Sequence, residues 1–318
     1  MQCKPRLPQA VGTLAVIVSD NNFRHQDKLT TTKKYTTGFV TSTDGTKIHY
    51  RQIGSGKGLV LVHGGMMYSQ NFMTLAELLA NDFTVYIPDR CGRGLSETHK
   101  NYSLLAESED IQAILNQTDT QNAFGLSSGA IIVLQTAIVS SALKKIALYE
   151  PPIFIDNINN NHLNKIFKNY ECAITNQNYG KAFINFLKGT DDNGSLIKLL
   201  PNFITVPLMN VALNLEAKKK LNEDEVPLKS LIAALQYDNQ VANQSHGIIE
   251  KIKAITADIL LLGGEKSQTF LKEVLDKLNI ELPKAKRITF PKIGHIAAHN
   301  EGKPELVANE LRNFFKTT

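Results

Sequence analysis

A serine between two glycines, in Gly125-Leu-Ser127-Ser128-Gly129, is the pattern in this chain that points most directly to chemistry. A short apolar run precedes it and a mostly apolar stretch, Ala130 to Val139, follows, so the serine would lie on a turn between a strand and a helix. Such a turn holds its serine at strained backbone angles, and the flanking glycines leave room for it. The Ser128 amide would then open a helix and point toward negative charge on a bound carbonyl. We predict a nucleophile at Ser127 and an oxyanion donor at Ser128; the alternative is an ordinary Gly/Ser turn.

A second glycine pair, in His63-Gly64-Gly65-Met66, follows the apolar run Gly58 to Val62. Loops at the carboxyl ends of buried parallel strands are where such sheets place ligands. Glycine lets a backbone amide approach a substrate oxygen, so we predict Gly65 as the second oxyanion donor, with Met66 as the alternative. His63 is interpreted as structural. Seen alone, the motif could also be a plain tight turn.

A serine nucleophile needs a neutral imidazole within hydrogen-bond reach. His295 fits this role because it follows an apolar run and Gly294 and precedes a helix opened by Pro304. His299 is a competitor, although the polar residues after it would place it nearer solvent. Without the serine motif, either histidine would be read as a surface-loop residue.

The elements that must position these residues alternate between strands and helices. The expected strands are Gly38–Thr43, Lys47–Ile53, Gly58–Val62, Phe83–Ile87, Ala123–Leu126, Lys145–Tyr149, Ile259–Leu262 and Arg287–Phe290. The expected helices are Met73–Ala80, Leu104–Asn116, Gly129–Val139, Thr269–Leu278 and Pro304–Phe315. This alternation predicts a doubly wound α/β fold with a mostly parallel sheet covered by helices on both faces.

Residues 153–257 break the rhythm and carry helical stretches only, Leu163–Thr175, Tyr179–Leu187 and Leu228–Asn239. We predict a helical cap inserted into a domain spanning residues 36–318, with Pro201, Pro207 and Pro227 breaking its helices. Residues 1–35 are interpreted as a weakly ordered extension. Its apolar run, Val11 to Val18, is too short to span a bilayer and is a poor signal peptide.

Composition narrows the function classes. Of 318 residues, 42% are hydrophobic and 20% charged, which is typical of a globular protein. The net charge of +5 is spread along the chain, and Lys218-Lys219-Lys220 reads as a solvated helix face rather than a nucleic-acid site. Three cysteines, Cys3, Cys91 and Cys172, imply neither a disulfide framework nor a metal site and fit a reducing compartment such as the cytoplasm.

Taken together, these motifs resemble those of the α/β-hydrolase-fold serine hydrolases. The resemblance rests on His63-Gly64-Gly65, on Asp89-x-x-Gly92-x-Gly94-x-Ser96, on Gly125-x-Ser127-x-Gly129 and on Gly294-His295, and it covers roughly residues 38–315. It implies Ser127 as nucleophile, His295 as base, and Gly65 and Ser128 as oxyanion donors. It implies no metal or organic cofactor. The segment from Asp89 lacks phosphate-loop spacing, so we interpret Asp89 and Arg90 as fixing a loop.

The third member of a triad is where the sequence departs from the family. The family usually carries Gly-x-x-Asp after its next-to-last strand, but here Ser267 stands where the aspartate would fall. Glu150, at a strand end before Pro151-Pro152, is the favoured acid, and Glu265 in the usual loop is the alternative. Glu150 could instead be a structural acid paired with Arg90 or Arg93. A dyad without an acid also stays open.

The predicted reaction is hydrolysis of a carboxylic ester or similar small acyl compound through an acyl-enzyme. The apolar loop residues Met66, Met67, Tyr68 and Phe72 would line the substrate pocket, or else pack in the core. Lactone or amide hydrolysis, acyl transfer, perhydrolysis and carbon–carbon cleavage remain open within the fold. A non-catalytic binding protein is the alternative of another class. No nucleic-acid partner or stable membrane insertion is expected, although a membrane-anchored N-terminus would favour a lipid substrate.

Overall fold

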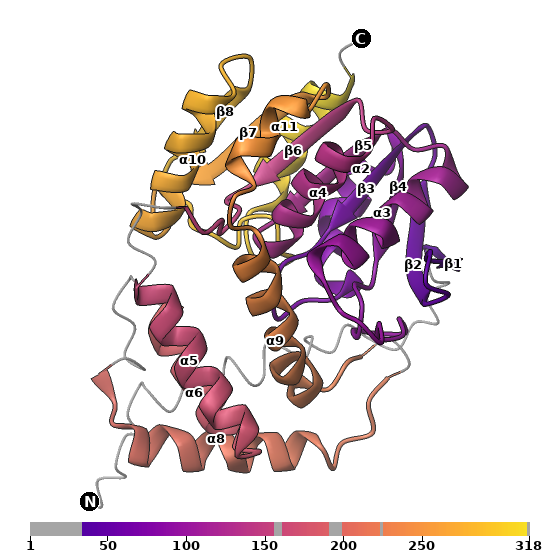
Figure 1. The fold of residues 1–318 in the computed structure, drawn as a ribbon. Coiled ribbons are helices and arrows are strands. Elements are labelled where there is room, and N and C mark those ends of the chain that lie inside the picture. The colour runs from indigo at the N-terminus through magenta and orange to yellow at the C-terminus, as the bar shows by residue number, and fades with distance from the viewer. Residues whose placement is uncertain (1–33, 156–160, 191–198, 223–224, 317–318) are drawn as a thin grey trace, which may run out of the picture. The chain divides into compact units, whose positions relative to one another are not determined.

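In the computed structural model, residues 34–155, 161–190, 199–222 and 225–316 are described. Eight strands form one sheet in the order β1-β2-β4-β3-β5-β6-β7-β8 (Figure 1). Their bounds are β1 Thr36–Thr41, β2 Lys47–Gly54, β3 Lys57–Val62, β4 Phe83–Pro88, β5 Asn122–Leu126, β6 Lys145–Tyr149, β7 Asp258–Gly264 and β8 Lys286–Phe290. β2 runs antiparallel to β1 and β4, and every other pairing is parallel. The predicted doubly wound, mostly parallel sheet is confirmed.

Helices cover both faces of this sheet. Those around it are η1 Ser69–Phe72, α2 Met73–Leu79, α3 Leu104–Thr118, α4 Ser128–Val139, η2 Ile249–Ala254, α10 Thr269–Glu281 and α11 Pro304–Lys316. Neighbouring β3 residues divide between two cores, because Val60 packs with residues of α3, α4 and α10 whereas Leu61 packs with residues of α2 and α11. Since strand side chains alternate between faces, a sheet buried on both sides needs the continuous apolar runs found in the sequence.

The β1–β2 hairpin forms as its turn residues predict. Val40 pairs with Ile48 across the hairpin, and Gly45 adopts a φ of 89° in the turn. The Thr46 amide donates to Asp44 Oδ1 at 2.9 Å, and this hydrogen bond within the turn stabilises it.

The described residues divide into two compact units. The sheet unit comprises residues 35–155, 221–222, 225–226 and 233–316, and the helical unit comprises Lys34 with residues 161–190, 199–220 and 227–232. The helical unit holds α5 Asn161–Thr175, α6 Tyr179–Thr190, α8 Asn202–Glu216 and the start of α9 Leu228–Gln244. It overlaps the predicted insert, but α9 from Ala233 onward belongs to the sheet unit.

Helix α8 corrects one expectation. Pro207 was expected to break a helix, yet it lies inside α8, while Pro201 forms the N-cap of that helix. A proline near the start of a helix removes one backbone hydrogen bond, and packing of buried Met209 and Leu213 offsets that loss. The prediction failed because it considered the effect of the proline on the helix backbone but not the packing of the buried face of the helix.

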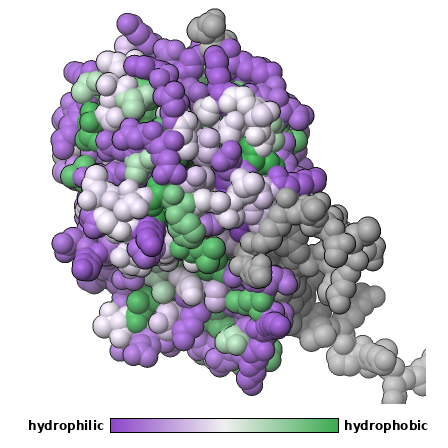
Figure 2. All heavy atoms as spheres, turned by 90° about the vertical axis from the view of Figure 1, so that its right-hand side faces the viewer, coloured by the Kyte–Doolittle hydropathy of each residue, from purple (hydrophilic) through white to green (hydrophobic). Residues whose placement is uncertain are grey.

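The face drawn in Figure 2 is mostly hydrophilic, with apolar residues in small separate patches. Within the described ranges, no helix is both long and apolar enough to cross a membrane. Cys91 is buried and Cys172 exposed, and both are free thiols. The predicted extension at residues 1–35 lies almost wholly outside the described residues, as does Cys3.

Candidate active site

The turn that carries Ser127 has the strained geometry that its glycines predict. Ser127 lies between β5 and α4 with φ 56° and ψ −126°, a region that non-glycine residues rarely adopt. A Cβ at Gly125 would lie 2.5 Å from the Ala130 Cα, and one at Gly129 would lie 2.3 Å from the Val62 carbonyl oxygen. Neither position tolerates a side chain, so both glycines are required for this turn.

A histidine and a carboxylate meet at the same edge of the sheet. His295 Nδ1 lies 2.7 Å from Glu150 Oε2, with the His295 side chain 32% exposed and the Glu150 side chain fully buried. Glu150 follows β6 directly and adopts a φ of 45°. Its other oxygen accepts a 2.6 Å hydrogen bond from the Gly264 amide, so the carboxylate is held at both oxygens.

Tyr149 connects this pair to the turn that carries Ser127. Its backbone carbonyl accepts from the Ser127 amide at 2.9 Å, and its hydroxyl donates to the Gly294 carbonyl at 2.8 Å. Burial raises the pKa of Tyr149 well above its ordinary value, so this hydroxyl stays a donor. One residue therefore ties the turn that carries Ser127 to the loop that carries His295, and the next residue in the chain is Glu150.

The alternative acid, Glu265, does not meet the histidine. Its carboxylate is exposed and accepts a 2.8 Å hydrogen bond from the Lys292 amide. Ser267, where the family aspartate would stand, is 7% exposed and its Oγ has no hydrogen-bond partner among the described residues. Of the two glutamates left open by the sequence, only Glu150 contacts His295.

The other two candidate histidines are held in loops. His299 Nε2 lies 2.8 Å from Asn71 Nδ2, its Nδ1 accepts from the Glu301 amide at 3.2 Å, and burial lowers its pKa to about 4. His63 Nδ1 lies 3.0 Å from the Gly64 carbonyl and its Nε2 accepts from the Arg90 amide at 3.2 Å. Burial, followed by nearby Arg90, lowers the pKa of His63 to about 3, so this ring is neutral and holds the loop.

The loop after β3 lies against Ser127. A Cβ at Gly64 would lie 3.0 Å from Ser127 Cβ, and Met66 adopts a φ of 59°. Of the four predicted pocket residues, Met67 and Phe72 are buried in the core that faces α2 and α11. Met66 and Tyr68 are only half-buried, and burial raises the pKa of Tyr68 to about 12.

Asp89 fixes the loop after β4, as expected. Its carboxylate lies 2.8 Å from His49 Nδ1 and accepts from the amides of Ser69 at 2.9 Å and Leu95 at 3.2 Å. Burial alone would raise the pKa of Asp89, but its hydrogen bonds with His49 and Ser69 lower it, so the carboxylate stays ionised.

Two arginines after Asp89 belong to a buried cluster of four charges that the sequence did not reveal. Arg90 donates from Nε and Nη2 to the two oxygens of Glu107, both at 2.7 Å, and from Nη1 to Asp238 Oδ1 at 2.8 Å. Arg93 donates from Nη2 to Asp238 Oδ2 at 2.6 Å. The arginines therefore pair with Glu107 and Asp238, and the pairing with Arg90 or Arg93 expected for a structural Glu150 is not formed.

A sequence signal for this cluster existed. Glu107 lies on the buried face of α3 with Leu104 and Ile111, and Asp238 lies on the buried face of α9 with Leu235. A carboxylate within an apolar stripe at helical spacing has to find a cation inside the protein. That pattern could have marked both acids.

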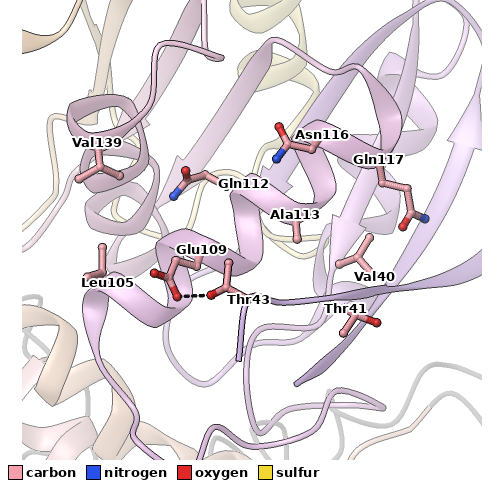
Figure 3. Close-up of a pocket in the computed structure, with 10 residues that line it drawn as sticks. All are labelled: Val40, Thr41, Thr43, Leu105, Glu109, Gln112, Ala113, Asn116, Gln117 and Val139. Atoms are coloured by element: carbon pink, nitrogen blue, oxygen red, sulfur yellow. Dashed lines mark hydrogen bonds between the residues drawn. The ribbon is translucent and has the colours of Figure 1, made fainter. Parts of the chain in front are cut away.

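A pocket in the sheet unit lies apart from these residues. It is formed by α3, β1 and the end of α4, and Figure 3 shows Gln112, Asn116 and Gln117 along α3 on one side of it. Thr43 Oγ1 donates to Glu109 Oε2 at 2.6 Å in this pocket. The residues that line it include no serine, cysteine or histidine, so they offer no nucleophile–base pair. Over the described residues, no cluster of histidine, cysteine and acidic side chains has the grouping of a metal site.

The chain belongs to the alpha/beta hydrolase fold family, whose family model matches residues 58–301. It is 33% identical over 124 residues to the uncharacterized hydrolase YraK of Bacillus subtilis, which is 37% of this chain and 46% of that protein. It is 30% identical over 84 residues to a cis-3-alkyl-4-alkyloxetan-2-one decarboxylase of Shewanella oneidensis, 25% of this chain and 26% of that protein. These matches span less than half the length of each relative. The crystal structure of an alpha/beta hydrolase from Sphaerobacter thermophilus superposes with a TM-score of 0.66 at 24% identity, covering 88% of this chain and all of that one.

Proposed function

We propose that this chain is a serine hydrolase that cleaves a carboxylic ester or similar small acyl compound, with Ser127 as nucleophile, His295 as base and Glu150 as acid. The contact of His295 Nδ1 with the buried Glu150 carboxylate carries the proposal. It is supported by Tyr149, which ties the Ser127 turn to the histidine loop.

The proton chemistry follows from that contact. Glu150 accepts from Nδ1–H, so the neutral ring presents a lone pair at Nε2, the nitrogen that takes the serine proton. As Ser127 attacks a carbonyl, the ring becomes positively charged and the carboxylate stabilises it. The Gly264 amide and the positive φ of Glu150 fix the carboxylate in place, so no reorganisation is needed during the step.

The oxyanion would rest on the amides of Ser128 and Gly65, with Met66 as the alternative to Gly65. Ser128 begins α4, where free amides point out of the helix. Gly64 is in van der Waals range of Ser127, which brings the loop after β3 to the nucleophile. Water then hydrolyses the acyl-enzyme, and the chemistry requires no cofactor.

A serine at this turn argues against reactions that need an aspartate nucleophile, such as epoxide opening. Met66 and Tyr68 are the residues we retain as pocket lining, because Met67 and Phe72 are core. We assign the helical unit the role of a cap and a small-molecule acyl compound the role of substrate.

A reducing compartment such as the cytoplasm fits the free thiols. Burial raises the pKa of Cys91 to about 12, which keeps this thiol unreactive.

Labelling with a fluorophosphonate probe tests the proposal, because the probe reacts with an activated serine. Wild type should label covalently, and Ser127→Ala should not label at all. Ser96→Ala is the matched control, since Ser96 Oγ donates to the Asp89 carbonyl and accepts from the His49 amide, and it should label like wild type. A wild-type protein that folds but does not label would overturn the proposal and favour a binding protein.

A further inference from the structure

The buried charge cluster touches both backbone segments that would form the oxyanion hole. Ser128 is 3% exposed, and its Oγ donates to Asp238 Oδ1 at 2.6 Å while accepting from Arg90 Nη1 at 2.9 Å. The serine that follows the nucleophile is thus held by a side chain of α9 and by a side chain of the loop after β4. Because the Ser128 hydroxyl both donates and accepts a hydrogen bond, its orientation is fixed.

The same two residues hold the glycine loop after β3. Arg90 donates from its amide to His63 Nε2 and from Nη1 to the His63 carbonyl at 3.3 Å. Asp238 packs against Gly65, where a Cβ would lie 3.1 Å from the carboxylate. Arg90 and Asp238 therefore each contact the Ser128 turn and the His63–Gly65 loop.

The charges are arranged so that this contact does not oppose an oxyanion. A carboxylate beside a developing negative charge would repel it, but two guanidinium groups here balance two carboxylates. Burial alone would raise the pKa of Asp238, yet Arg93 and Arg90 outweigh it and hold it at about 2. Asp238 therefore stays ionised at neutral pH, and the four formal charges of the cluster sum to zero.

A stable core does not require such a cluster. Removing four charges from water is costly, and apolar residues of similar volume often serve a core as well or better. The bonds from Arg90 and Asp238 to Ser128 and His63 are the feature that an apolar core would lack. They set the distance between two segments that come from different strands.

We propose that Arg90 and Asp238 are positioning residues for the oxyanion hole, acting through the Ser128 hydroxyl and the His63 carbonyl to fix the two amide-bearing segments against each other. This inference rests on the proposed function. Neither side chain touches the reacting atoms; a shift of about 1 Å in a donor costs on the order of a hundredfold in rate.

The test measures how the rate of fluorophosphonate labelling depends on probe concentration, which separates probe binding from the maximal labelling rate. Ser128→Ala keeps the backbone amide and removes only the two side-chain bonds. We expect it to lower the maximal rate by about tenfold to a hundredfold with probe binding unchanged. Asp238→Ala should act similarly, and Asp238→Asn, which keeps an acceptor for the Ser128 hydroxyl, should recover part of the rate.

Two comparisons keep the result decisive. The Ser128→Ala/Asp238→Ala double variant should be no slower than the slower single variant, because each single change already breaks the hydrogen bond between Ser128 and Asp238. His99→Gln, which disrupts a buried ion pair outside the site, should lower the melting temperature without slowing labelling. A labelled wild type with Ser128→Ala at the wild-type rate overturns the positioning proposal alone. The same holds if Asp238→Ala lowers only the melting temperature. Failure of the wild type to label overturns the proposed function itself.

Discussion

The loops that follow β6 and β7 each carry a glutamate, and only one of the two meets a histidine. Glu150 is fully buried, adopts a φ of 45° and contacts His295 Nδ1 at 2.7 Å. Glu265 is exposed and accepts from the Lys292 amide. The loop after β7 is the usual place for the acid in the family that this chain resembles. Here the carboxylate in that loop, that of Glu265, accepts a hydrogen bond from a backbone amide.

The two glutamates differ in the strand end from which each side chain starts. Glu150 comes directly after β6, whose neighbours in the sheet are β5, which leads into Ser127, and β7. A side chain placed there starts between the strand that leads into Ser127 and the loop that carries His295. Glu265 starts one strand further from Ser127 and turns toward Lys292 instead.

The largest expected effect comes from removing the charge of Glu150. In Glu150→Gln, the amide nitrogen would face the Nδ1–H of His295, which favours the ring tautomer with Nε2 protonated and unable to accept a proton. We expect fluorophosphonate labelling to slow by about 10³–10⁴-fold. Labelling kinetics measure this directly, and the Ser127→Ala variant gives the background rate.

Glu265→Gln is the matched control because it makes the same chemical change one loop away. The amide oxygen can still accept from the Lys292 amide, so the rate should stay within about twofold of wild type. If Glu265→Gln were the slow variant, the acid assignment would be wrong while the serine hydrolase would stand.

A smaller effect is expected from moving the acid between the two loops. Ser267 lies in the turn that begins at Gly264, whose amide holds Glu150, and its buried Oγ has no partner among the described residues. In the Glu150→Gln background, Ser267→Asp should recover about tenfold of the lost labelling rate, because a carboxylate can again face the ring. No recovery would mean that only the β6 position reaches His295.

The sequence predicted most of the sheet, because a strand buried on both faces must be an apolar run and such runs are visible. It also predicted Ser127 and His295 as site residues, and the glycines two positions either side of Ser127 are ones that the backbone requires. It favoured Glu150 but left Glu265 open, because strand order and side-chain direction decide which carboxylate meets the ring. Apolar Phe72 fits a core or a pocket equally well, and only burial separates the two.

The smallest effect on labelling is expected at His99, another histidine that contacts carboxylates. His99 Nε2 lies 2.9 Å from Asp110 Oδ2 and its Nδ1 lies 2.8 Å from Asp44 Oδ2. Burial alone would lower the pKa of His99, but the two aspartates outweigh it and raise that pKa to about 9. Because this value lies above the ordinary 6.5, the charged ring stabilises the fold fully below about pH 6.5. That stabilisation is lost as the pH rises through about 9.

Between pH 7.5 and 9.5, the melting temperature of wild type should therefore fall by at least about 3 °C more than that of His99→Gln, measured by circular dichroism. An equal fall in both proteins would contradict a charged His99, whereas a slowed labelling rate in His99→Gln would show that a histidine–carboxylate pair outside the site also serves the chemistry.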